Sequence, residues 1–397
     1  MAMAGRAFFA DQIDSQDHRL DPVFIALVVA LIIFGLGMLW SASWFRAQQL
    51  YGEPLRFVLR HALWIVTGIV VMAISAVVPL SWIRRLLPLI VLASVVVSLL
   101  TFVPGISARY MGARRWIIIF NVSFQPSEVL KATMVIYLAH ILARREGEFE
   151  EPLQSLIPPT IIVGVFAGIV LLQNDFSTAV FIGLVAAAMF YAAGVPNRYF
   201  AGLFALAVPL TLISLFTREH RVRRIIAFLN PGYDPSGSGY QILAARRALQ
   251  NGGFWGAGIG QSTRKFGGLP EAQSDFLFAV AAEELGLVGV ITVVGLFLLL
   301  FGRGLYLARR QDDWFRSLLI FGLSTSIFLQ ALLNIAVVAG AVPATGIPLP
   351  FFSAGGSSLV ITFAMCGLIL NASGGERQER RFSMAGVDGR VWEGSRG

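Results

Sequence analysis

Residues 23–43 read VFIALVVALIIFGLGMLWSAS, a run that contains no charged side chain. A helix needs about 20 apolar residues to cross the hydrocarbon core of a bilayer, so this run is long enough to span a membrane. Further runs of the same kind follow along the chain. Together they predict an all-α, polytopic integral membrane protein with about ten transmembrane helices, near residues 23–43, 61–80, 86–104, 124–142, 156–173, 177–195, 199–216, 276–302, 317–342 and 351–371.

The composition of the chain agrees with a membrane protein. Its 397 residues are 56% hydrophobic and 14% charged, whereas a soluble domain carries about 25% charged residues. We therefore expect one membrane domain at 21–372, between a tail at 1–20 and a flexible, glycine-rich tail at 373–397. The single cysteine, Cys366, excludes a disulfide within the chain.

The distribution of Lys and Arg predicts the orientation, because cytoplasmic loops carry an excess of positive charge. With ten spans, both tails lie on one side, and that side carries 16 Lys and Arg residues, against 6 in the short loops of the other side. The remaining loop, at 217–275, carries 8 and is near the length at which the rule stops applying. We expect both termini in the cytoplasm and this long loop outside.

The long loop at 217–275 combines glycines with aromatic side chains such as Tyr233 and Trp255. A loop of this length inside a compact domain is usually functional or disordered, and the aromatic side chains argue against disorder. Within it, residues 242–249 mix apolar side chains with two arginines. This pattern predicts a helix that lies at the membrane interface.

The fourth span opens with FQPSEVLK at 124–131. An ionisable residue at the centre of a membrane helix costs about 2.5–3.5 kcal/mol, so each one is informative. Glu128 and Lys131 are three residues apart and can pair on one helix face. They form either a self-contained ion pair or a polar patch that faces a substrate. We favour the patch, because Arg114 and Arg115 lie just upstream and make the external mouth cationic.

Three further sites contain carboxylates. Asp275 lies where the long loop meets the eighth span; there it can cap the helix or, partly desolvated, act as a general base. Glu283 and Glu284 lie about two turns into that span and point to different faces, so structural and functional roles are equally supported. Asp175 lies in a short external turn, where capping of the sixth span is the favoured interpretation.

The run ATGIPLPFFSAGGSS at 344–358 interrupts what hydropathy places at membrane depth. Irregular backbone at that depth has to be covered by protein or line a wet cavity. The run therefore predicts a broken or re-entrant segment, without indicating a ligand.

In their order along the chain, these runs resemble the SEDS (shape, elongation, division and sporulation) family, over nearly all of residues 20–372. They are closer to its FtsW, or division, branch than to its RodA, or elongation, branch. The chain has QND at 173–175 where the family more often has Gln-Pro-Asp, and QSD at 273–275 in place of His-Thr-Asp. Neither difference removes a carboxylate. The runs that carry the resemblance are 112–116, 124–131, 173–175, 237–241, 269–276, 283–286 and 345–358.

The resemblance implies ten transmembrane helices with a large external loop between the seventh and eighth. It also implies an inverting glycosyltransferase that polymerises lipid II into peptidoglycan strands at the outer face of the bacterial inner membrane, for septal wall synthesis. Asp275 matches the essential aspartate of the family and is expected to be catalytic. The residues expected at the substrate site are Glu128, Lys131, Arg114, Arg115, Gln125, Ser127, Asp175, Glu283 and Ser357.

The implied reaction releases a pyrophosphate, which needs positive charge nearby. Arg114, Arg115, Lys131 or a divalent cation such as Mg²⁺ would supply it. The expected partners are lipid II, glycan linked to undecaprenyl pyrophosphate, a class B penicillin-binding protein transpeptidase, other divisome proteins and membrane lipid, and no nucleic acid.

Two other functions remain open. A lipid II flippase would also need polar residues in its spans and a broken helix, but the candidate residues gather at the external mouth rather than at the midplane. A non-catalytic scaffold for a transpeptidase would leave the Glu128–Lys131 pair unexplained.

Overall fold

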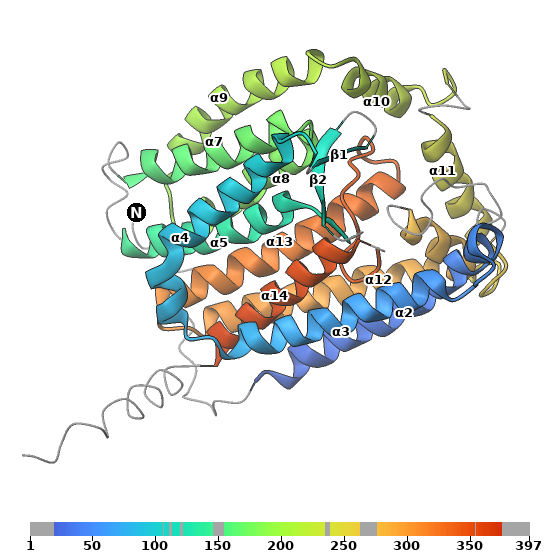
Figure 1. Ribbon diagram of the computed structural model, residues 1–397, viewed down its shortest axis with the longest axis horizontal. Coiled ribbons are helices and arrows are strands. Elements are labelled where there is room, and N and C mark those ends of the chain that lie inside the picture. The colour runs from blue at the N-terminus through green and yellow to red at the C-terminus, as the bar shows by residue number, and fades with distance from the viewer. Residues whose placement is uncertain are drawn as a thin grey trace, which may run out of the picture.

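The computed structural model describes residues 20–105, 107–110, 113–119, 122–145, 155–234, 239–262, 276–353 and 355–374. All ten expected spans are helices in it, which confirms the polytopic fold (Figure 1). Seven are long and apolar enough to cross a membrane, and α7 and α8 are shorter apolar helices. The ten helices are α2 (Pro22–Tyr51), α3 (Arg56–Val77), α4 (Leu80–Leu99, extended by the 3₁₀ turn Leu100–Phe102), α5 (Pro126–Arg144), α7 (Ile157–Leu172), α8 (Phe176–Ala192), α9 (Asn197–Phe216), α12 (Leu277–Arg309), α13 (Trp314–Val338) and α14 (Gly356–Ser373).

The helices alternate in direction, so the described chain begins and ends at the same end of the bundle (Figure 1). Contacts support this arrangement: Asn371, at the end of α14, donates hydrogen bonds to the carbonyl oxygens of Ser75 and Val78 at the end of α3, at 2.9 and 2.6 Å. We call this end the terminal face. The opposite end, where α5 and α12 begin, is the loop face.

An ion pair at the terminal face fixes the start of α2 against the end of α12. Asp21 caps α2 by accepting a hydrogen bond from the amide of Phe24 at 2.7 Å. Two guanidinium nitrogens of Arg303 also bind its carboxylate, at 2.5 and 3.1 Å. Burial acts to raise the pKa of Asp21, but the bonds from Arg303 and Phe24 outweigh it and hold the pKa below the ordinary value.

The loop face carries structure that the hydropathy pattern did not predict. A small antiparallel sheet, in the order β1-β2-β3, connects α4 to α5. The helix predicted at 242–249 is present, but its residues Ile242, Ala244, Ala245 and Ala248 are buried and it packs against α12 rather than lying only at the interface. The additional elements are β1 (Ser107–Tyr110), β2 (Ala113–Ile119), β3 (Val122–Phe124), α10 (Glu219–Leu229) and α11 (Tyr240–Gly252).

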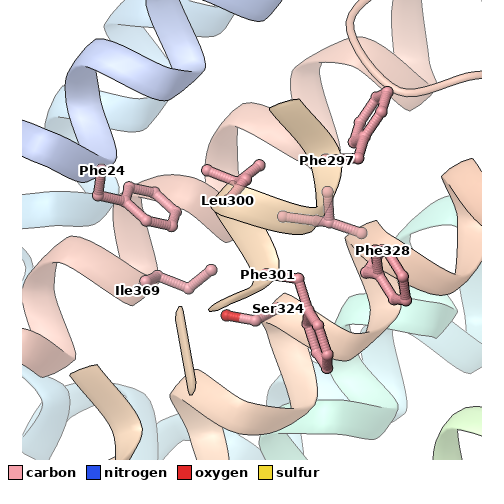
Figure 2. Close-up of a pocket in the computed structure, with 8 residues that line it drawn as sticks. Phe24, Phe297, Leu300, Phe301, Ser324, Phe328 and Ile369 are labelled. Carbon is pink, nitrogen blue, oxygen red and sulfur yellow. The ribbon is translucent and has the colours of Figure 1, made fainter. Parts of the chain in front are cut away.

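Part of the hydrophobic core lies where α2, α12, α13 and α14 meet. Figure 2 shows Phe24, Leu300 and Ile369, from α2, α12 and α14, grouped near the hydroxyl of Ser324 on α13, with Phe297 of α12 farther from it. The space between these side chains is too small to hold a water molecule. The helices are therefore closely packed at this point, without room for a channel.

Glycines bring α3 and α14 into direct contact, as is common between membrane helices. A Cβ atom added at Gly68 would lie 2.2 Å from the ring of Phe363, and one added at Gly367 would lie 2.3 Å from the carbonyl oxygen of Met72. The second contact is with backbone, which cannot move aside as a side chain can.

We expect Gly367→Ala to lower the stability of the protein by about 1–3 kcal/mol, because the added methyl group forces α3 and α14 apart. Gly164→Ala on α7 is the matched control, since a Cβ there meets no atom within 4 Å. Thermal unfolding of both variants in detergent measures the effect. An unchanged Tm for Gly367→Ala would contradict this account of the α3–α14 contact.

Candidate functional site

The predicted ion pair is present at the start of α5. Lys131 Nζ lies 2.9 Å from Glu128 Oε1, and both side chains are at most 3% exposed. Lys131 also donates a hydrogen bond to Gln330 Oε1 of α13 at 2.9 Å and lies 5.0 Å from the ring centre of Phe181. The second carboxylate oxygen of Glu128 is buried and has no hydrogen-bond partner in the described part of the chain. It is therefore a buried acceptor whose hydrogen-bonding capacity the described residues leave unused.

A second charged pair joins the sheet to α8. Arg115 Nη1 on β2 lies 3.7 Å from Asp175 Oδ2, and Gln125 Nε2 donates to the same oxygen at 3.3 Å. Gln125 also donates to the hydroxyl of Ser127 at 3.1 Å. The other oxygen of Asp175 accepts from the amide of Thr178 at 3.2 Å, so Asp175 caps α8 as expected and binds its neighbours as well.

Two side-chain carboxamides of α13 donate hydrogen bonds to backbone carbonyl oxygens of the irregular segment that precedes α14. Gln330 Nε2 donates to the carbonyl oxygen of Pro348 at 3.0 Å and to Ser358 Oγ at 3.3 Å. Asn334, one turn later, donates to the carbonyl oxygen of Ile347 at 2.9 Å. The predicted irregular segment is present, and hydrogen bonds from α13 satisfy part of its backbone. Sequence reasoning did not select Gln330 or Asn334, although two amides one turn apart in an apolar span were a visible signal.

These contacts form one group at the loop face, which we call the loop-face cluster. Ser357 at the start of α14 completes it, because its hydroxyl accepts from the amide of Gln125 at 3.3 Å. The cluster joins β2 to the ends of four helices that are distant in the sequence. Its members are Arg115, Gln125, Ser127, Glu128, Lys131, Asp175, Gln330 and Ser357.

Glu283 and Glu284 lie on α12 and have different partners, as expected for adjacent helical residues. Glu283 accepts from the hydroxyl of Ser262 and, at 3.2 Å, from Asn251 Nδ2. Glu284 accepts from Ser41 Oγ of α2 at 2.6 and 2.8 Å. The Glu283 bonds hold the end of α11 and the chain that follows it against α12, whereas the Glu284 bonds join α12 to α2.

Three glycines press the same two segments together, and we call them the glycine clasp: Gly252, Gly256 and Gly286. Gly286 interrupts α12 with φ 63° and ψ −155°, a conformation that is essentially restricted to glycine. A Cβ atom at Gly252 would lie 2.0 Å from the carbonyl oxygen of Ala282, and one at Gly256 would lie 2.2 Å from that of Glu284. The break in α12 frees backbone carbonyls that accept bonds from this loop, including Gly258 N to Glu284 O at 3.0 Å.

The catalytic candidate Asp275 lies outside the described residues, and of Arg114 the structure describes only its position on β2. Ser262 and Phe276, the described residues on either side of the 263–275 segment, are both buried, and Ser262 is bound to Glu283. Within the described ranges, no group of three His, Cys, Asp or Glu side chains could hold a metal ion.

The model of the FtsW/RodA/SpoVE family of cell cycle proteins matches residues 22–378, which is nearly the whole chain. The chain belongs to this family. It is 37% identical over 354 residues to a probable peptidoglycan glycosyltransferase FtsW of Geobacter sp. (strain M18), covering 89% of this chain and 96% of the relative. It is also 37% identical over 360 residues to the protein of that name from Borreliella burgdorferi, covering 90% and 97%.

Solved structures share the fold. One, described as showing "structural coordination of polymerization and crosslinking by a peptidoglycan synthase complex", contains a chain with a TM-score of 0.74 and 27% identity, covering 89% of this chain and 97% of that one. The rod shape determining protein RodA of Thermus thermophilus has a TM-score of 0.66 and 25% identity, covering 89% and 96%. The resemblance to the SEDS family, and the multi-pass membrane architecture that it implied, are thereby confirmed.

We expect Glu128→Met and Lys131→Met to lower stability by about 3–5 kcal/mol each, because each leaves a buried charge without its partner. The double substitution should lower the free energy of unfolding by less than either single substitution, since it removes both charges. Thermal unfolding in detergent of the two single variants and the double variant measures the coupling. Additive losses would show that the pair does not act as a unit.

The exposed pair Glu219 and Arg223 on α10 is the matched control, because its side chains are 79% and 66% exposed. The same three methionine variants there should change stability by less than about 1 kcal/mol.

Proposed function

We propose that this protein is a peptidoglycan glycosyltransferase that polymerises lipid II into glycan strands at the outer face of the inner membrane, for septal wall synthesis. The observation that carries the proposal is the loop-face cluster, which gathers the buried Lys131, the partly exposed Arg115 and hydrogen-bonding groups at the face predicted to be external. Relatives at 37% identity bear the name peptidoglycan glycosyltransferase FtsW, which supports both the reaction and the division role.

The proposed reaction is a single inverting displacement. The 4-hydroxyl oxygen of the N-acetylglucosamine of lipid II attacks the anomeric carbon at the end of the growing glycan. The bond from that carbon to the undecaprenyl pyrophosphate breaks, and the pyrophosphate leaves with the electron pair. Asp275 takes the proton of the attacking hydroxyl as general base. No further energy source is required, because the pyrophosphate bond is already activated.

The loop-face cluster contributes charge and orientation to this step. The pyrophosphate gains negative charge as it leaves, and fixed cations stabilise that charge best where water is excluded. Arg115 is 22% exposed and Lys131 only 3% exposed. Arg115 is thus the more accessible cation, while Lys131 holds Glu128 in place. The unpaired oxygen of Glu128 would accept a hydrogen bond from a hydroxyl or amide of the sugar.

The position of the cluster favours a transferase over a lipid II flippase. A transporter binds its substrate near the midplane, between its repeats. Here the paired charges lie in the first two turns of α5, at the loop face. Below that level, the closely packed core of Figure 2 lies between α2, α12, α13 and α14.

The proposed partner is a class B penicillin-binding protein transpeptidase, within the divisome. The solved complex that contains a structurally similar chain is described as coordinating polymerisation with crosslinking, which supports this pairing. The proposed orientation, with both termini in the cytoplasm, places the loop face on the side where such an enzyme would act.

We expect Asp275→Ala to abolish the polymer, with a loss of at least about 10²–10⁴-fold, as for removal of a general base. The assay is gel analysis of glycan products from the purified protein, its cognate transpeptidase and labelled lipid II. Glu219→Ala is the matched control, an exposed carboxylate in the same long loop, and should retain wild-type activity. If the wild-type protein makes no polymer but moves lipid II across vesicle bilayers, the flippase takes the place of the transferase.

We expect Arg115→Gln to lower kcat/KM by about 10²-fold, the usual effect of removing one group that stabilises developing charge. Arg115→Lys should recover part of the loss, because it restores the charge without the planar guanidinium. The same polymerisation assay measures both, and Arg223→Gln on the exposed face of α10 serves as control. Full activity of Arg115→Gln would remove Arg115 from the proposed mechanism.

A further inference from the structure

A cavity of about 360 Å³ lies at the terminal-face end of α7, α8 and α9, far from the loop-face cluster along these helices. Its walls come from the first turns of α7 and α9 and from the end of α8, with Ile157, Phe190 and Leu203 among the lining side chains. Apart from Thr160, Arg198 and the Tyr199 hydroxyl, the side chains that line it are apolar. The volume falls within the usual range for ligand pockets, about 300–1,000 Å³.

The cavity can be reached from the lipid phase. Helix α9 has no buried residue and lies at the edge of the bundle in Figure 1, where it contacts only α8 and α10 extensively. On the other side of the cavity, Ile157 and Ile161 of α7 are 44% and 56% exposed. In a bilayer, a hydrocarbon chain could therefore enter between α7 and α9 from the side.

A cation stands at the mouth of this apolar space. Arg198 is the second residue of α9, is exposed, and lies 5.2 Å from the ring centre of Tyr199. No acidic residue lies in the first turn of α9, and none of the side chains that line the cavity is acidic. Among the described residues, the site thus joins an apolar compartment to a positive charge that has no acidic neighbour in the first turn of α9 or in the lining of the cavity.

We propose that this cavity binds an anionic phospholipid of the leaflet at the terminal face, with an acyl chain in the cavity and the phosphate at Arg198. That leaflet is cytoplasmic in the orientation predicted from the loop charges, and the cytoplasmic leaflet is where anionic lipids attract basic residues. A helix from another protein does not fit, because at a diameter of about 10 Å a single turn would fill the volume. The proposal does not depend on the glycosyltransferase activity.

The selectivity of such a site comes from the headgroup. An acyl chain gains little by leaving the bilayer for the cavity, because the lipid interior is equally apolar. The contact between phosphate and Arg198 is also available to zwitterionic lipids, but their own cationic group opposes it. One arginine contributes about 1 kcal/mol toward anionic lipid, which corresponds to a preference of about fivefold.

Native mass spectrometry of the full chain tests the proposal. The protein is released from detergent micelles that contain equal amounts of phosphatidylglycerol and phosphatidylcholine with the same acyl chains. The wild-type protein should retain about fivefold more phosphatidylglycerol. Arg198→Gln should bring the ratio close to one, because it removes the charge and leaves the cavity.

Gly202→Leu tests the cavity itself. Gly202 lines it, and a Cβ atom there meets no atom within 4 Å, so a leucine fills the space without disturbing neighbours. This variant should retain less of both lipids, and its preference for phosphatidylglycerol should fall from about fivefold to close to one, since a lipid whose chain cannot enter the cavity no longer places its phosphate at Arg198. Gly183→Leu on α8 is the matched control, because Gly183 is also an open helical glycine but does not line the cavity. It should behave as the wild-type protein.

Two results would overturn the proposal: a wild-type ratio near one, or Gly202→Leu retaining as much lipid as Gly183→Leu. Undecaprenyl phosphate added in competition separates the two lipid classes. If undecaprenyl phosphate displaces phosphatidylglycerol at a lower concentration than phosphatidylglycerol needs to displace undecaprenyl phosphate, the occupant is a polyprenyl lipid. The phospholipid assignment is then wrong. Arg198→Gln keeps the test decisive if Gly202→Leu does not fold, because that exposed substitution changes the headgroup ratio alone.

Discussion

The buried pair of Glu128 and Lys131 is the interaction on which the loop face depends. Removing two charges from water costs several kcal/mol for each ion, so the pair persists only if its surroundings supply good geometry and further hydrogen bonds. Gln330 supplies one to Lys131 and, through its amide nitrogen, fixes the carbonyl oxygen of Pro348. The ion pair that forms part of the candidate site thereby also connects α5 to α13 and, through Gln330, to the irregular segment before α14. The buried polar side chains at this depth therefore stabilise the fold and also form part of the candidate site.

Hydropathy predicted the membrane architecture well, because the bilayer admits few alternatives to helices. The run at 23–43 became Pro22–Tyr51, a longer helix, since hydropathy reports the apolar part and not the polar turns beyond it. The sheet at 107–124 was missed because its strands have only 4, 7 and 3 residues, too few to show a clear alternation of apolar and polar side chains. The break at Gly286 was also invisible, because a lone glycine in an apolar helix is common in membrane proteins.

Spacing alone predicts only those contacts of the site that are local in the sequence, whereas Arg115, Asp175 and Ser357 were named as substrate-site residues through the family resemblance. Glu128 and Lys131 are three residues apart, so helical geometry alone brings them together. Arg115 meets Asp175, and Lys131 meets Gln330, only after the fold brings distant segments together. No spacing rule contains that information. Asp275 stays a prediction that rests on the family motif, because it lies outside the described residues.

The glycine clasp also limits how this protein can change. At Gly286 the backbone has φ 63° and ψ −155°, and any other side chain at Gly252 or Gly256 would overlap a carbonyl oxygen of α12. A substitution changes the side chain but leaves the main-chain atoms at these positions in place. Replacing the glycines would also force α11 and α12 apart. A small molecule that made its hydrogen bonds to this stretch of main chain would therefore face few viable resistance mutations at its point of contact.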